Sequence, residues 1–131
     1  MNVIREELET KLAVLSAAFA RGADARAIGD LMYEEDVVVI GEGDPSATRG
    51  LTAFMPTLAA HLEEWGGKPN VTFKLIDPIL TEGNVASAFL DITLIPSIAD
   101  ALTQHYRSMF GWRRSAKGWR VALEMYAAGV T

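Results

Sequence analysis

Two acidic residues on separate predicted strands, Asp91 and Glu124, offer the most direct chemistry in this sequence. If both carboxyl groups point into one apolar cavity, they cannot both ionise easily, so they would share a proton and titrate as a pair. Such a pair supplies a general acid and a general base near neutral pH. Tyr106 and Ser108, on the strand predicted to lie between them, could donate a hydrogen bond to a ligand oxygen.

Glu124, Asp91 and Tyr106 each also have a purely structural interpretation. Glu124 could form an ion pair with Arg107 or Arg120 across a hairpin, which contributes ~0.2–1 kcal/mol when the pair is exposed. Asp91 could be a surface residue on an exposed strand. Tyr106 could complete a hydrophobic core with its hydroxyl group satisfied. The residue types alone leave both interpretations open.

Several other chemistries lack the residues they require. The two histidines, His61 and His105, have no partner histidine at metal-ligand spacing, so no metal is predicted. There is no cysteine, and therefore no thiolate nucleophile or disulfide. The loop "GEGDPSATRG" resembles a phosphate loop only in its glycines, because it carries Glu42 and Asp44 and no lysine. No cofactor is predicted.

Composition narrows the possible partners. The 131 residues suit one domain, predicted to span 1–131, and the net charge of −5 argues against nucleic acid. No apolar run approaches the ~20 residues of a membrane span, and the absence of cysteine weakly favours the cytoplasm. Half of the residues are apolar, so we expect a core, a pocket and a subunit interface to bury them. The densest basic cluster surrounds a predicted turn, where solvated charges are ordinary: Arg113, Arg114, Lys117 and Arg120.

The hydrophobic pattern predicts three helices and then an antiparallel meander. Apolar residues recur every three or four positions in each predicted helix, and Asp24 can cap the second helix. The run Val37–Ile40 is β-branched throughout, which predicts a strand buried on both faces. This order indicates an α+β fold with the helices packed on one face of a curved sheet. The helices are predicted at 3–20, 25–35 and 51–65, and the later strands at 71–80, 85–95, 103–114 and 119–128.

The chain resembles the nuclear transport factor 2-like superfamily, most closely its SnoaL-like and ketosteroid-isomerase-like branch. It is also similar to the association domain of calcium/calmodulin-dependent protein kinase II. The segments that carry the resemblance are "LMYEEDVVVIGEGDPSATRG", "SAFLDIT" and "GWRRSAKGWRV". The resemblance implies a cone-shaped, cystatin-like fold in which the sheet wraps against three helices around an apolar cavity. It also implies a homodimer formed through the outer face of the sheet.

The resemblance and the residue pattern disagree about the strand at 85–95. By pattern alone, Ala88, Leu90, Ile92 and Leu94 look like core, and the face with Asp91 looks solvent-exposed. The association domain places a pocket-lining arginine where this chain has Asp91. That resemblance therefore implies that Asp91 and Phe89 point into the cavity, and that the apolar face meets a partner subunit.

The catalytic residues of ketosteroid isomerase do not carry over. Aligned by the second helix and the last hairpin, the base falls on Gly41, the tyrosine near Leu15 and the second acid near Phe110. None of these residues can perform the corresponding step. The standard isomerase mechanism is therefore not expected.

Two hypotheses follow for the function. One is an acid–base isomerase, cyclase or dehydratase that acts on a small, mostly apolar molecule, with Asp91, Glu124 and Tyr106 as catalytic groups. The other is a non-catalytic ligand-binding or oligomerisation module. The remaining predicted lining residues are Phe19, Tyr33, Phe54, Leu58, Phe89, Ser108, Phe110, Trp112 and Tyr126.

Overall fold

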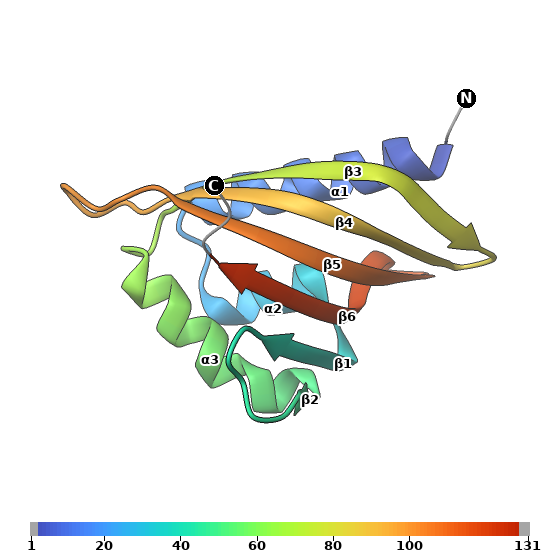
Figure 1. Ribbon diagram of the computed structural model, residues 1–131, viewed down its shortest axis with the longest axis horizontal. Helices are drawn as coiled ribbons and strands as arrows, with labels where there is room; N and C mark the ends of the chain where they lie inside the picture. The colour runs from blue at the N-terminus through green and yellow to red at the C-terminus, as the bar shows by residue number, and fades with distance from the viewer. Residues whose placement is uncertain (1–2, 129–131) are drawn as a thin grey trace.

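The computed structural model describes residues 3–128 and confirms the α+β class, with three helices and a six-stranded, unclosed sheet over that range (Figure 1). The helices are α1 (Val3–Ala20), α2 (Ala25–Met32) and α3 (Leu51–Glu64). The strands are β1 (Tyr33–Gly41), β2 (Thr48–Arg49), β3 (Asn70–Glu82), β4 (Val85–Ile95), β5 (Gln104–Ser115) and β6 (Gly118–Ala128). The two-residue strand β2 was not predicted, because its sequence carries no alternating pattern.

The sheet has the strand order β2-β1-β6-β5-β4-β3. Strands β3 to β6 form the predicted antiparallel meander, while β1 joins the sheet beside β6 in parallel orientation. Figure 1 shows α1 running behind β3 and α3 lying beside β1, so the helices cover one face of the curved sheet. The opposite, outer face of the sheet carries no helix within the described residues.

The helices begin and end largely where their capping residues and apolar stripes predict. In α1, the buried residues Leu8, Leu12, Leu15 and Phe19 recur at intervals of three or four, as an amphipathic helix requires. Asp24 caps α2 by accepting a hydrogen bond from the backbone N–H of Ala27 at 2.9 Å. Among residues 3–128, no helix combines the length and the apolar character that crossing a membrane requires.

The predicted end of the second helix at residue 35 is wrong. The helix ends at Met32, because Tyr33 is already extended and pairs with Val121 of β6. The strand that follows is also less buried than predicted. Val37 and Val39 are buried, whereas Val38 and Ile40 are partly exposed on the outer face. Helices therefore cover only one side of β1.

A β-bulge in β6 determines which residues reach the interior. Gly111 pairs with Leu123 and Trp112 pairs with Val121, so Ala122 is an extra residue with no partner of its own. One extra residue in a strand reverses the alternation of its side chains from that point on. Val121 therefore points inward before the bulge, and Glu124 points inward after it.

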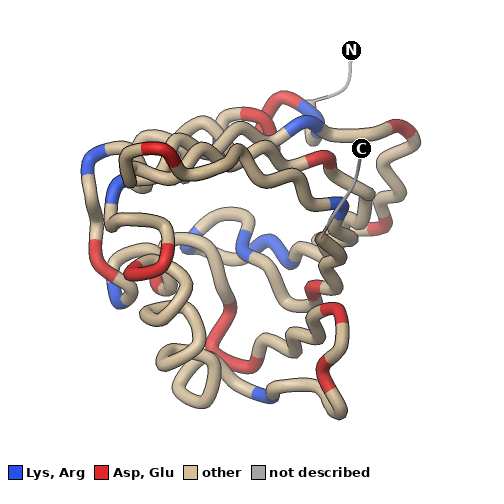
Figure 2. The backbone as a smooth tube through the Cα atoms, turned by 60° about the vertical axis from the view of Figure 1, so that its left-hand side comes forward, with Lys and Arg blue, Asp and Glu red and all other residues tan. Residues whose placement is uncertain are grey.

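One member of the basic cluster near the β5–β6 turn is buried, contrary to the prediction of solvated charges. The Arg120 guanidinium contacts the Glu34 carboxylate at 3.0 and 3.2 Å, and both residues are only 8% exposed. Arg113 binds Asp36 at the surface, where each side chain is about half exposed or more. Figure 2 shows that Lys and Arg are otherwise spread around the chain and form no single basic face.

Candidate functional site

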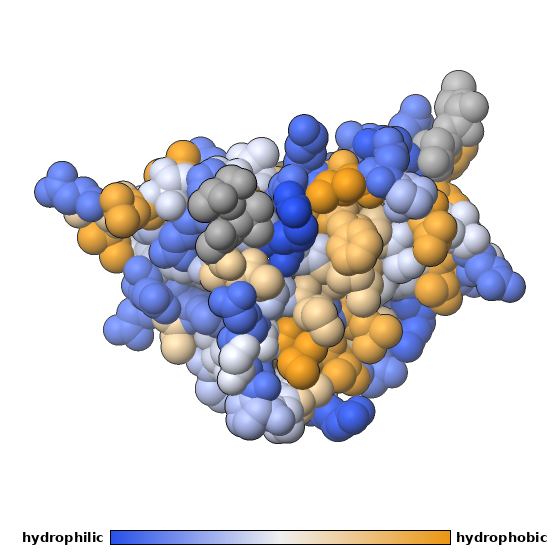
Figure 3. Space-filling view, in the orientation of Figure 1, coloured by the Kyte–Doolittle hydropathy of each residue, from blue (hydrophilic) through white to orange (hydrophobic). Residues whose placement is uncertain are grey.

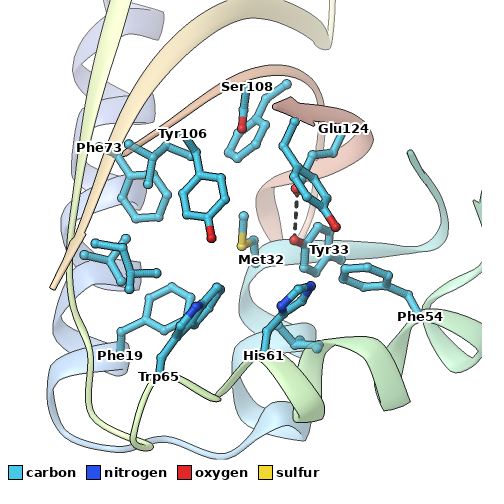
Figure 4. Close-up of a pocket in the computed structure, with 16 residues that line it drawn as sticks. Phe19, Met32, Tyr33, Phe54, His61, Trp65, Phe73, Tyr106, Ser108 and Glu124 are labelled. Atoms are coloured by element: carbon cyan, nitrogen blue, oxygen red, sulfur yellow. Dashed lines mark hydrogen bonds between the residues drawn. The ribbon is translucent and has the colours of Figure 1, made fainter. Parts of the chain in front are cut away.

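An apolar cavity of about 90 Å³ lies between the helices and the concave face of the sheet (Figure 4). Its wall is formed by α1, the end of α2, the start of β1, α3 and the strands β3 to β6. The lining residues are Phe19, Met32, Tyr33, Phe54, Leu58, His61, Trp65, Val71, Phe73, Ile92, Leu94, Tyr106, Ser108, Phe110, Glu124 and Tyr126. The few polar groups among them therefore determine what the cavity can do chemically.

Glu124 is the lining residue whose acid–base properties depart most from the ordinary. The bulge in β6 turns its carboxyl group inward, where Oε1 accepts a hydrogen bond from the Tyr33 hydroxyl at 2.8 Å (Figure 4). Burial raises the pKa of Glu124 from 4.5 to about 7, although the hydrogen bond from Tyr33 acts in the opposite direction. At neutral pH, the carboxyl group is therefore poised between its protonated and ionised forms.

Tyr33 is suited to orient this carboxyl group and not to give up its own proton. Its side chain is buried, and its ring packs edge-on against Phe54 with centroids 5.4 Å apart. Burial, followed by the charge of Glu124, raises the pKa of Tyr33 well above 10. The tyrosine therefore remains a hydrogen-bond donor throughout the physiological pH range.

Ser108 and Tyr106 differ in whether their hydroxyl groups are already satisfied. Ser108 is 2% exposed, and its hydroxyl has no hydrogen-bond partner within the described residues. A buried polar group without a partner costs about 1–3 kcal/mol, which a ligand oxygen in the cavity could recover. The Tyr106 hydroxyl, in contrast, donates a hydrogen bond to Gln104 at 2.5 Å. The Ser108 hydroxyl is therefore the one that is free to form a hydrogen bond with a ligand.

The structure contradicts the predicted orientation of Asp91 and Phe89. Asp91 lies on the outer face and forms an ion pair with Arg107 at 2.8 Å, and Phe89 is 57% exposed on the same face. The opposite residues of β4, including Leu90, are buried against the helices or line the cavity. Side-chain alternation fixes this outcome, because burying the apolar face of β4 leaves its polar face outside. The predicted sharing of a proton between Asp91 and Glu124 is therefore wrong.

Trp112 faces the interior but does not reach the cavity. It is 1% exposed and stacks edge-on against Phe110, with centroids 5.5 Å apart. Its strand partners, Ala86 and Val121, are both buried as well. It belongs to the hydrophobic core that supports the cavity wall.

The structure brings together around the cavity most of the other residues named from sequence. They are Phe19, Tyr33, Phe54, Leu58, Tyr106, Ser108, Phe110, Glu124 and Tyr126. Lining residues that the sequence did not predict are Met32, His61, Trp65, Val71, Phe73, Ile92 and Leu94. Among them, His61 of α3 and Trp65 at its C-terminal end point into the cavity in Figure 4. The spacing of His61 and Trp65 could have indicated this, since His61 lies three positions after Leu58 and Trp65 lies three positions after Leu62.

The fold matches solved structures along essentially the whole chain. A ketosteroid isomerase-like protein from Erwinia carotovora atroseptica is 20% identical, with a TM-score of 0.72 and complete coverage of both chains. A proposed dehydratase of the NTF2-like family from Streptomyces avermitilis is 15% identical, with a TM-score of 0.73 over 96% of each chain. A proposed calcium/calmodulin-dependent protein kinase II association domain from Thiobacillus denitrificans is 16% identical, with a TM-score of 0.69, and the match covers 93% of this chain and 94% of that one.

These similarities establish a nuclear transport factor 2-like, cystatin-like fold, as the sequence resemblance predicted. No family model matches the chain, and no curated protein matches it. The matched proteins differ widely, since one is described as ketosteroid isomerase-like and another as an association domain. The fold therefore does not select a function, which has to be argued from the cavity itself.

Proposed function

We propose that the cavity binds a small, mostly apolar molecule that carries an oxygen atom, and that Glu124 exchanges a proton with it. The observation that carries this proposal is a carboxyl group with a pKa of about 7, held by Tyr33 inside an otherwise apolar cavity. A group with a pKa near the working pH is well suited to act as a general acid or base. The reaction class is isomerisation, cyclisation or dehydration, each of which moves a proton on a neutral organic molecule.

The polar groups of the cavity suit a carbonyl or hydroxyl group better than an anion. Ser108 can donate a hydrogen bond to a ligand oxygen, and this bond would satisfy its own unpartnered hydroxyl. Among the described residues that line the cavity there is no lysine or arginine, so no permanently charged cation there compensates an anionic ligand next to Glu124. A neutral ligand also avoids the cost of burying a second charge.

Exchange of carbon-bound hydrogen for deuterium in acetone tests proton transfer by Glu124 directly. Acetone is the smallest neutral ketone, and loss of its proton NMR signal in D₂O reports abstraction of a proton next to the carbonyl group. General acid–base groups typically contribute ~10²–10⁴-fold. We expect the wild-type protein to accelerate the exchange, and Glu124→Gln to reduce the protein-catalysed rate by about 100-fold or more.

Asp91→Asn is the matched control, because it removes a carboxylate that lies on the other side of the sheet. It should retain the wild-type exchange rate within about a factor of two, since the effect of an exposed charge is largely screened by solvent. If Glu124→Gln exchanged acetone as fast as the wild type, Glu124 would not be the proton acceptor.

We also propose that the outer face of the sheet mediates self-association. Apolar residues lie in register across five strands, and Figure 3 shows them as an apolar patch on the uncovered face. This apolar stripe consists of Ile76, Phe89, Met109, Met125 and Ile40. Its members Phe89 and Met125 are more than half exposed, which is typical of a surface that a second copy covers.

Substitution of Phe89 by glutamate should convert a dimer into a monomer, because the substitution places a charge at the centre of the apolar stripe. Sedimentation velocity across ~1–100 μM, a range that spans typical affinities of protein association, would measure the change. Thr72→Glu, on the same face but at edge strand β3, should leave the association unchanged. A monomeric wild-type protein throughout this range would contradict the proposed interface.

A further inference from the structure

Four aromatic side chains follow one another along a partly exposed part of the cavity wall. Trp65 stacks on His61 with ring centroids 5.2 Å apart. His61 and Tyr126 form a T-shaped pair at 6.4 Å, and Tyr126 and Tyr106 form another at 6.3 Å. All four line the cavity and are partly exposed, whereas the rings deeper in the cavity, such as that of Phe110, are buried. We call these four residues the aromatic arc. Any ligand that enters from this side has to pass the arc.

Tyr126 occupies its place in the arc because residue 41 has no side chain. Gly41 and Tyr126 are register partners on the parallel strands β1 and β6. A methyl group on Gly41 would lie 2.5 Å from the Tyr126 hydroxyl oxygen and 2.8 Å from Cε2 of its ring. The backbone of Gly41 does not have a positive φ angle, so its conformation does not require glycine. What requires glycine is the space that the Tyr126 ring fills.

The volume of the cavity then limits what fits beneath the arc. An apolar cavity of ~150 Å³ is known to hold benzene, whereas this cavity measures about 90 Å³. The space beneath Tyr126 is therefore smaller than the one known to hold a six-membered ring. The Tyr126 ring lies against Gly41 and is nearly perpendicular to the rings of His61 and Tyr106, so three residues limit its movement.

We infer that Tyr126, seated against Gly41, is the residue that determines specificity for ligand size. The cavity accepts short acyclic alcohols and ketones, and it rejects ligands that contain a six-membered ring. This inference rests on the proposed function, because it assigns a size class to the ligand of the same cavity. It also gives Gly41 a role, as the residue that makes room for the ring of Tyr126.

Phenol is the probe that tests the size limit. We expect phenol to leave the backbone amide signals of Ser108 and Phe110 unchanged in the NMR spectrum of the wild-type protein. In Tyr126→Ala, which removes the ring, phenol should shift both signals and bind at least tenfold more tightly. Tyr126→Phe is the matched control, because it keeps the ring and should still reject phenol. Equal binding of phenol to wild type and Tyr126→Ala would overturn the inference.

A double-mutant cycle tests the contact between Gly41 and the Tyr126 ring without any ligand. Gly41→Ala should lower the unfolding midpoint of the wild-type protein, because the added methyl group clashes with the Tyr126 ring. The same substitution in the Tyr126→Ala background should leave the midpoint unchanged or raise it, since the clashing ring is gone. Equal effects in the two backgrounds would show that the pair is not coupled, and would overturn the role of Gly41.

The two proposals fail in distinguishable ways. If Glu124 drives acetone exchange but Tyr126→Ala does not bind phenol, the size limit is wrong and the proton transfer stands. If Tyr126→Ala binds phenol but no protein-dependent acetone exchange occurs, the size limit stands and the proton transfer is wrong. If there is no protein-dependent acetone exchange, no phenol binding to Tyr126→Ala and no coupling between Gly41 and Tyr126, the cavity does not bind a ligand as proposed. The inference about ligand size would then be wrong as well.

Discussion

Glu124→Gln should raise the free energy of unfolding by about 3 kcal/mol at pH 8 and change it little at pH 4. The folded-state pKa of Glu124, about 7, lies above the ordinary value of 4.5 that applies to the unfolded chain. Its contribution to stability is therefore fully present below pH 4.5 and is lost as the pH rises to about 7. Glutamine mimics the protonated form at every pH and can still accept the hydrogen bond from Tyr33, so the variant avoids this loss of about 3 kcal/mol.

Urea denaturation at pH 4, 6 and 8 measures this difference, and Asp91→Asn is again the control. Asp91 lies at the surface in an ion pair with Arg107, so its substitution should change stability by less than ~1 kcal/mol at pH 8. The advantage of Glu124→Gln over the wild type should increase from pH 4 to pH 8. A variant that is less stable than the wild type at pH 8 would mean that Glu124 is ionised and stabilised in the folded protein, and that burial does not raise its pKa.

Glu34→Gln should destabilise the protein by about 3 kcal/mol at pH 7. Arg120 is 8% exposed, and Glu34 supplies the carboxylate that balances its charge, at 3.0 and 3.2 Å. Removing one partner of a buried pair leaves an uncompensated charge, which typically costs ~3–5 kcal/mol. The backbone carbonyl of Asp30, 3.4 Å from the Arg120 guanidinium, compensates only part of the loss. Chemical denaturation measures the change directly.

Asp36→Asn is the matched control for this second prediction. Its carboxylate contacts Arg113 at 3.1 Å, but the pair is exposed, so we expect a change below ~1 kcal/mol. Both substitutions remove one negative charge from β1, but the Glu34–Arg120 ion pair is buried and the Asp36–Arg113 ion pair is exposed. Equal effects would show that burial of the Glu34–Arg120 pair contributes nothing to stability.

Local patterns in the sequence were sufficient to predict the helices, the meander and the cap at Asp24. An apolar residue at every third or fourth position determines which face of α1 is buried, whatever surrounds the helix. Alternation along β4 likewise predicted its buried face correctly from the residues alone. The resemblance to the association domain implied the opposite face for β4, and the resulting placement of Asp91 in the cavity was wrong.

The central contact of the site could not be predicted, because it depends on long-range geometry. Tyr33 and Glu124 are 91 residues apart, and they meet because β1 joins the sheet beside β6. Glu124 was named from the sequence as a cavity acid, but its inward orientation is produced by a bulge at Ala122, whose residue type does not mark a bulge. A strict alternation along β6 would have placed Val121 and Glu124 on opposite faces.

The pKa of Glu124 in the folded protein tests the central claim most directly. Carbon-13 NMR of the glutamate side-chain carboxyl groups follows each titration, and Glu124→Gln identifies the signal by its loss. We predict that one glutamate signal titrates with a midpoint near pH 7, and that this signal is missing from the variant. If the signal of Glu124 titrated near its ordinary value of 4.5, the cavity would hold an ordinary carboxylate and the proposed proton transfer would be contradicted.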